Sequence, residues 1–169
     1  MLVLRATRKV LRALPQVAAL SEVSDTALGD WYVNRVVIDR RPLLLLVSEK
    51  SRLSILEPAR DVKRLPLYLS AIVSRRLVAL AIPDLQIAEE TKAMTPVTVG
   101  PTKDKSIVGQ LVDFAKAIPY YLPEGDWGEA DLRTTEDKLG ETPCLCSAKV
   151  SRTIWPIQET RKLLAARWS

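Results

Sequence analysis

The stretch from Gly29 to Pro58 limits the fold of this chain more than any other. It contains two runs of β-forming residues, WYVNRVVI and LLLLV, separated by a short polar break. β-Branched and aromatic residues suit the pleated, partly buried surface of a sheet. The pattern therefore predicts two antiparallel strands, at about 31–39 and 42–48, joined by a tight turn.

The second run, Leu43 to Val47, does not alternate between apolar and polar residues. A strand without alternation is typically covered on both faces, which places this one near the centre of its sheet. Pro42 is compatible with this assignment, because proline is tolerated as the first residue of a strand. A further short segment, Leu53 to Leu56, predicts either a third strand or a helical turn.

The spacing of apolar residues and the positions of prolines predict the remaining helices and strands. Leu2 to Leu4 resembles a first strand and Thr95 to Val99 an additional one, and apolar spacings of three and four residues indicate helices. The expected helices cover 8–14, 65–82, a segment from Ile107 that Pro119 ends, 129–139 and a last one from Pro156. We expect a single α+β domain over residues 1–169. Its sheet is mainly antiparallel and centred on the 31–48 hairpin, with helices mainly on one face.

The composition is that of a globular protein, with 47% hydrophobic and 27% charged residues among 169. No apolar run approaches the roughly 18 residues of a membrane span, so we expect no membrane association. The first residues, MLVLRATRKVLRAL, lack the apolar core and cleavage site of a secretion signal. With only two cysteines and no disulfide framework, the chain is expected in a reducing cytoplasm.

The chain contains no histidine. This excludes Ser-His-Asp and Cys-His catalysis and histidine-ligated metal sites. Cys144 and Cys146 have a CxC spacing, but a metal site would need further soft ligands, for example across an oligomer interface. The alternative is that both are small, partly buried residues, and we expect neither a metal ion nor a cofactor.

Charge is distributed unevenly along the sequence. Residues 1–80 carry a net charge of +7, residues 81–147 carry −6, and residues 148–169 carry +4, against +5 for the whole chain. One interpretation is solvated faces that balance one another. The other is a basic surface for nucleic acid or an acidic protein partner.

Basic residues near predicted turns and helix starts are the candidate binding residues. Lys103, Lys105 and Ser106 precede a predicted helix, whose first backbone amides attract anions, although the glycine pattern of a phosphate-binding loop is missing. A capped helix with solvated lysines is the alternative. The complete set of candidate nucleic-acid or anion-binding residues is Arg8, Arg12, Arg35, Arg40, Arg41, Lys103, Lys105 and Ser106.

Two other groups around the hairpin have both a functional and a structural interpretation. Tyr32 is a candidate for stacking on a base, the alternative being a core aromatic. The carboxylates Asp30, Asp39 and Glu49 could bind a divalent ion or act in acid–base chemistry. Because arginines and lysines lie beside them, structural ion pairs at strand ends are the alternative.

Several quoted segments together resemble a family of small bacterial proteins classified as a domain of unknown function. They are MLVLRATRKVLRAL, LGDWYVNRVVIDRRPLLLLVSEKSRLSIL, KSIVGQLVDF and GETPC before a basic last helix. The family pattern has Asn-Arg-Ser where this chain has Asp104-Lys105-Ser106, and Met-Asn-Asp-Phe where it has Leu111-Val112-Asp113-Phe114. The resemblance implies a bacterial cytoplasmic protein and brings no established activity.

The first functional hypothesis is a non-enzymatic, nucleic-acid-associated or protein-partner module of a bacterial mobile-element or toxin–antitoxin type system. The alternative is an enzyme that acts on a phosphate-bearing substrate without histidine chemistry. It requires a pocket where Lys103, Lys105 and Ser106 meet a carboxylate of the hairpin. A purely structural or oligomeric protein, such as a homodimer, is the third interpretation.

Overall fold

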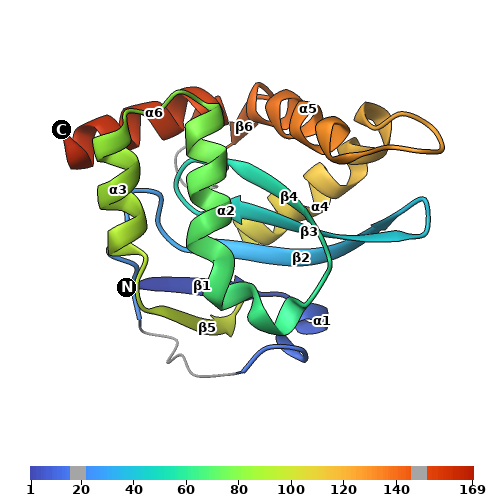
Figure 1. Cartoon of the computed structure of the whole chain (residues 1–169), viewed down its shortest axis with the longest axis horizontal. Helices are drawn as coiled ribbons and strands as arrows, with labels where there is room; N and C mark the ends of the chain where they lie inside the picture. Colours follow the sequence, from blue (N-terminus) through green and yellow to red (C-terminus); the bar gives the residue numbers. More distant parts are fainter. Residues whose placement is uncertain (16–21, 146–151) are drawn as a thin grey trace.

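The computed structural model describes residues 1–15, 22–145 and 152–169. Five strands form one sheet in the order β4-β3-β2-β1-β5 (Figure 1). β2 is antiparallel to β3, and β3 to β4, whereas β1 is parallel to both β2 and β5. The strands are β1 (Leu2–Ala6), β2 (Trp31–Ile38), β3 (Arg41–Ser48), β4 (Ser54–Pro58) and β5 (Val97–Pro101).

The predicted hairpin is confirmed to within a residue at each boundary, and it includes the central strand of the sheet. Its register runs from Trp31 opposite Ser48 to Ile38 opposite Arg41. Asp39 and Arg40 form the turn with φ values of 51° and 64°. Positive φ at both turn residues matches the twist of a two-residue hairpin.

The segment from 53 to 56 was expected to be either a third strand or a helical turn. It belongs to strand β4, so the strand is the correct alternative.

Helices cover both faces of this sheet. They are α1 (Arg8–Leu11), α2 (Leu65–Ala79), α3 (Asp84–Ala93), α4 (Lys105–Tyr121), α5 (Glu129–Gly140) and α6 (Pro156–Trp168), with the short 3-10 helix η1 (Val62–Arg64). α1, α2, α3 and α6 pack on one face, and α4 and α5 pack on the other (Figure 1). A small second sheet joins β6 (Cys144–Leu145) to β7 (Thr153–Ile154). The α+β class and the mainly antiparallel sheet are confirmed, but the placement of helices mainly on one face is wrong.

The leucine run of β3 explains why both faces are covered. Leu44 and Leu46 point into the core beneath α2, where they pack with residues such as Leu69. Leu43 and Leu45 point the opposite way and pack in the core beneath α4. All four leucines are at most 1% exposed. Because successive strand residues face opposite sides, an unbroken apolar strand is stable only between two layers.

Other boundaries differ from the sequence prediction in places that have a physical explanation. α3 was not expected, because its apolar residues do not form one stripe: Leu85 is 65% exposed while Glu90 is fully buried. α4 continues through Pro119 instead of ending there. Pro119 has no N–H to donate to the carbonyl four residues earlier, so the last turn continues with one backbone hydrogen bond fewer.

Glu90 connects three parts of the chain in the interior. Its carboxylate accepts hydrogen bonds from the backbone N–H groups of Ala27 (2.9 Å) and Leu28 (3.1 Å) and from Nε1 of Trp168 (2.6 Å). The contacts fix the segment before β2 and the end of α6 against α3.

In the part of the chain that the structure describes, no helix is both long and apolar enough to cross a bilayer.

Candidate nucleic-acid interface

Strand direction brings three basic segments to the same edge of the sheet. β1, β2, β4 and β5 run in the same direction, so their carboxyl ends point toward one edge, and three basic segments lie at the ends of β1, β2 and β4. The segments at these ends are 8–12, 35–41 and 60–64. We call their Lys and Arg residues, all of which are exposed, the basic edge: Arg8, Lys9, Arg12, Arg35, Arg40, Arg41, Arg60, Lys63 and Arg64.

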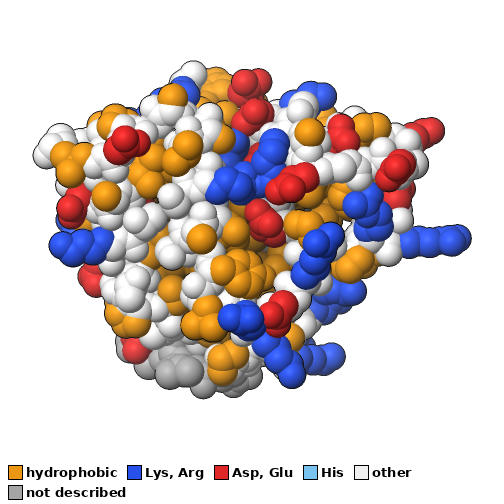
Figure 2. All heavy atoms as spheres, in the orientation of Figure 1, with side chains coloured by type: hydrophobic (Ala, Val, Ile, Leu, Met, Phe, Trp, Pro, Cys, Tyr) orange, Lys and Arg blue, Asp and Glu red, His pale blue; other side chains and the backbone are white. Residues whose placement is uncertain are grey.

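Positive charge is concentrated at this edge. The three segments carry nine basic and two acidic residues, a net charge of +7, whereas the whole chain has +5. Both acids have partners: Asp39 accepts a hydrogen bond from Nε1 of Trp127 at 3.2 Å, and Asp61 lies 3.8 Å from Nε of Arg64. Figure 2 shows Lys and Arg side chains gathered over η1, α1 and the hairpin. The field of this edge therefore favours an anionic partner.

Four of the predicted binding residues lie together at the basic edge. α1 crosses the end of β1 and contacts β2, which brings Arg8 and Arg12 next to the hairpin. Arg35 follows Trp31 and Val33 on the face of β2 that carries the α1 side of the core. Arg40 is exposed at the hairpin turn.

Arg41 also belongs to the basic edge, but its guanidinium is held by the protein. It stacks over the ring of Trp127 with 3.5 Å between the guanidinium carbon and the ring centroid. Its Nη1 donates to the backbone oxygen of Trp127 at 2.6 Å. Trp127 is 2% exposed and lies just before α5. The contact joins the hairpin to the loop before α5 and fixes the plane of the guanidinium.

Lys103, Lys105 and Ser106 follow β5, whose carboxyl end also points toward this edge, but they belong to the other helical layer. They lie at the start of α4, which packs on the opposite face of the sheet from α1. Asp104 caps the helix, because its Oδ1 accepts from the backbone N–H of Ser106 at 2.8 Å. Ser106 Oγ accepts from Nη2 of Arg52 at 3.0 Å. A protein carboxylate therefore already occupies the position predicted for a bound anion.

Tyr32 is a core residue, so its predicted stacking role is wrong. It is 1% exposed, and its hydroxyl oxygen accepts from the backbone N–H of Asp104 at 3.1 Å. Burial raises its pKa; the hydrogen bond from Asp104 opposes this, and the negative charges of Glu49, Asp30 and Asp104 add to the rise. A ring enclosed beneath α4 offers no face to a base.

The carboxylates at the base of the hairpin form structural contacts. Asp30 Oδ2 accepts from Nε of Arg5 at 2.9 Å, and both side chains are buried. Glu49 Oε2 accepts from the backbone N–H of Asp30 at 2.9 Å. Across residues 1–15, 22–145 and 152–169, no group of three His, Cys, Asp or Glu side chains is arranged to hold a metal ion. Cys146, half of the CxC pair, lies outside the described residues.

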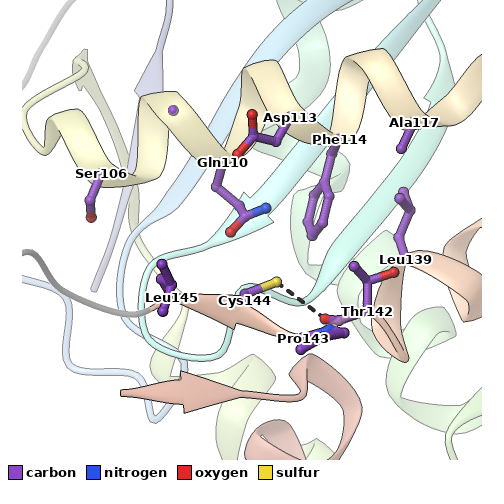
Figure 3. Close-up of a pocket in the computed structure, with 11 residues that line it drawn as sticks. Ser106, Gln110, Asp113, Phe114, Ala117, Leu139, Thr142, Pro143, Cys144 and Leu145 are labelled. Atoms are coloured by element: carbon purple, nitrogen blue, oxygen red, sulfur yellow. Dashed lines mark hydrogen bonds between the residues drawn. The ribbon is translucent and has the colours of Figure 1, made fainter. Parts of the chain in front are cut away.

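Ser106 does line a cavity, of about 510 Å³, between α4 and β6 (Figure 3). Phe114 points into it, and Cys144 Sγ donates to the backbone oxygen of Thr142 at 3.3 Å. Among the described residues that line this cavity, Asp113 contributes a carboxylate. The described lining includes neither Lys103 nor Lys105 nor an acidic residue of the hairpin. The convergence that the enzyme hypothesis requires is therefore not found among the described residues.

Sequence reasoning missed four members of the basic edge: Lys9, Arg60, Lys63 and Arg64. The last three lie in the segment ARDVKR, between a predicted strand and a predicted helix. Its charge density was a usable signal. The signal becomes informative only with the strand directions, which place this segment beside the hairpin.

Comparison with known proteins gives one match. The family described as "Domain of unknown function (DUF6933)" matches residues 3–159 of the chain. No curated protein and no solved structure matches this chain. The family match covers the main sheet from Val3 in β1 onward and the helices α1 to α5.

Proposed function

This chain belongs to the DUF6933 family, a domain of unknown function, and we propose that it binds nucleic acid through the basic edge. The observation that supports the proposal is the convergence of nine exposed Lys and Arg residues from three separate segments. Regularly spaced phosphates give nucleic acids a dense negative charge, and neutralising them releases condensed counterions. A surface with several cations from different elements therefore suits a nucleic acid better than it suits a single small anion.

The composition of the edge supports phosphate contacts in particular. Seven of its nine cations are arginines. The planar guanidinium presents its donors in a fork that matches phosphate oxygens, whereas lysine acts as a point charge. The hairpin extends beyond the ends of β1 and β5, so Arg35 and Arg40 lie on a projecting arm (Figure 1). The proposal is one of binding and assigns no catalysis.

The test is retention of labelled DNA and RNA by the purified protein as salt is increased. If several phosphates are contacted, the logarithm of the affinity falls linearly with the logarithm of salt concentration, with a slope of about −0.9 per phosphate on duplex DNA. Absence of retention at low salt would refute the proposal. Retention of an acidic peptide in place of nucleic acid would redirect it to a protein partner.

A matched pair of double variants localises the binding. Lys9→Ala with Lys63→Ala removes two exposed lysines of the basic edge. We expect the salt slope to decrease by about two and the affinity to fall about tenfold. The control replaces two exposed lysines on α3 and α6, Lys92→Ala with Lys162→Ala, and should leave both quantities unchanged. Equal losses in both pairs would contradict binding through this edge.

A further inference from the structure

A cavity of about 320 Å³ opens beside the basic edge, between the hairpin, α2 and the loop before α5. Arg41, Arg60, Tyr68 and Trp127 contribute to its lining. We infer that this cavity receives one unpaired nucleobase, so that the partner is a single-stranded nucleic acid. The inference rests on the proposed function, because the basic edge supplies the contacts to the adjoining phosphates.

The Arg41–Trp127 stack gives the cavity a preformed planar wall. The indole supports one face of the guanidinium at 3.5 Å, and the backbone oxygen of Trp127 holds Nη1 at 2.6 Å. Arg41 is nevertheless exposed as a residue and lines the cavity. Bases stack on guanidinium planes as well as on aromatic rings, and a plane that is already ordered loses little entropy when a base binds.

Tyr68 supplies an aromatic ring to the same cavity from α2. Its hydroxyl donates to the backbone oxygen of Arg60 at 3.3 Å, which orients the ring toward the segment after β4. The side chain is only partly buried. Arg60 is therefore positioned both at the cavity and in the basic edge, where it is available to a phosphate next to the bound base. An aromatic ring beside arginines is the usual arrangement for binding single strands.

The carboxylates near the cavity do not cancel this arrangement. Glu57 contributes to the lining, but its Oε1 lies 3.1 Å from Nη2 of Arg75 and 3.5 Å from Nη1 of Arg133. Arg75 and Arg133 also pair with Glu136, so these two arginines and two glutamates form one ion-paired cluster without net charge. Glu129 also lines the cavity and is exposed to solvent, where water and salt screen its charge.

The geometry distinguishes a single strand from a duplex. A base inside a duplex is stacked on both faces and paired along its edge, so it does not enter a lateral cavity without being flipped out. A base in a single strand can splay away from its neighbours at a much smaller cost. The cavity volume lies at the lower end of the range of about 300–1,000 Å³ for small-molecule sites. It is thus suited to a single base.

The experiment compares three labelled nucleic acids with the same number of phosphates by fluorescence anisotropy at low salt. One is a short oligothymidylate, the second is a strand of the same length with abasic tetrahydrofuran sugars in place of nucleosides, and the third is a duplex of half that length. We expect the oligothymidylate to bind about tenfold more tightly than the abasic strand, as is typical for one stacked base. Tyr68→Leu should lower its affinity to that of the abasic strand, without changing the abasic affinity. Tyr68→Phe should retain wild-type behaviour.

The outcomes separate this inference from the proposed function. Equal affinities of the wild type for the oligothymidylate and the abasic strand, or tighter binding of the duplex, would overturn the base cavity but leave binding through the basic edge. Absence of binding to all three would overturn both. The wild-type comparison does not depend on the folding of any variant. Lys9→Ala with Lys63→Ala should weaken binding to both single strands by the same factor, because it removes phosphate contacts alone.

Discussion

Individual buried charges have a clear structural role in this protein. Glu136 is fully buried, and its Oε2 accepts from the backbone N–H of Leu56 at 2.8 Å. One turn earlier in α5, Nη2 of Arg133 donates to the backbone oxygen of Leu56 at 2.8 Å. Two side chains thus satisfy the outward backbone groups of a residue in the edge strand β4. This attaches α5 to the sheet and prevents another strand from pairing there.

Replacing Glu136 tests how much this attachment contributes to stability. Its carboxylate also lies within 3.2 Å of guanidinium nitrogens of Arg75 and Arg133. Glu136→Gln removes the charge and leaves the guanidinium groups without full compensation, at an expected cost of about 3 kcal/mol. Urea unfolding measures the change. Glu141→Gln, at an exposed position beyond the same helix, should change stability by no more than about 0.5 kcal/mol. Equal effects would refute the role of Glu136.

The raised pKa of Tyr32 leads to a prediction of how protein stability changes at alkaline pH. Burial raises its pKa in the folded protein above the ordinary value of 10.0. The folded state therefore holds its proton where the unfolded state releases it, so stability decreases as pH rises above 10.0 and through the raised pKa. Tyr32→Phe removes this group, and the decrease should become shallower. Urea unfolding at several alkaline pH values measures the slope; an unchanged slope would contradict the prediction.

At the scale of elements, the hairpin combines a buried base with an exposed end. The first three residues of β2 are buried, whereas exposure alternates from Asn34 to Ile38. Leu43 to Ser48 in β3 are buried throughout. The same two strands therefore serve as the centre of the sheet and as a projecting basic arm. Their apolar half lies between two helical layers, which fixes the direction in which the arm extends.

Two glycines in different elements should respond oppositely to alanine. Gly109 lies in α4, and a Cβ there would have no neighbouring atom within 4 Å. Gly109→Ala should stabilise the protein by about 0.5–1 kcal/mol, because alanine favours a helix. Gly29 has a φ of 77°, and a Cβ there would collide with the Glu49 carboxylate, so Gly29→Ala should be destabilising. Thermal unfolding compares them, and a shift of the same sign in both would contradict this account.

At the scale of the whole molecule, charge and topology act together. The three segments of the basic edge carry +7, so the rest of the chain has a net charge of −2. Burial of a neutral ion pair, such as Arg5 with Asp30, leaves this difference in net charge unchanged. The molecule therefore has a strong charge asymmetry that its total of +5 does not reveal. Such an asymmetry orients an approaching polyanion toward one edge.

Local patterns predicted much of the fold. The β-branched runs predicted the hairpin, spacings of three and four residues predicted α2 and α4, and Pro156 with the apolar residues after it predicted α6. α3 was missed because its buried positions include Glu90 instead of forming an apolar stripe. In the candidate site, Arg40 was found from the turn signal. Tyr32 was assigned to the wrong environment, because a strand residue can face either layer and the sequence does not show which layer is closed.

The sequence by itself determined the class of the protein, the hairpin and the identity of most basic residues, because these depend on neighbours along the chain. Only the tertiary structure decided which cations lie near one another. It brought Arg60, Lys63 and Arg64 beside the hairpin, placed Lys103 and Lys105 at the start of α4 on the opposite face of the sheet from α1, and stacked Arg41 on Trp127. The physical reason is that strand order and direction are set by pairings between distant residues, which local periodicity does not encode.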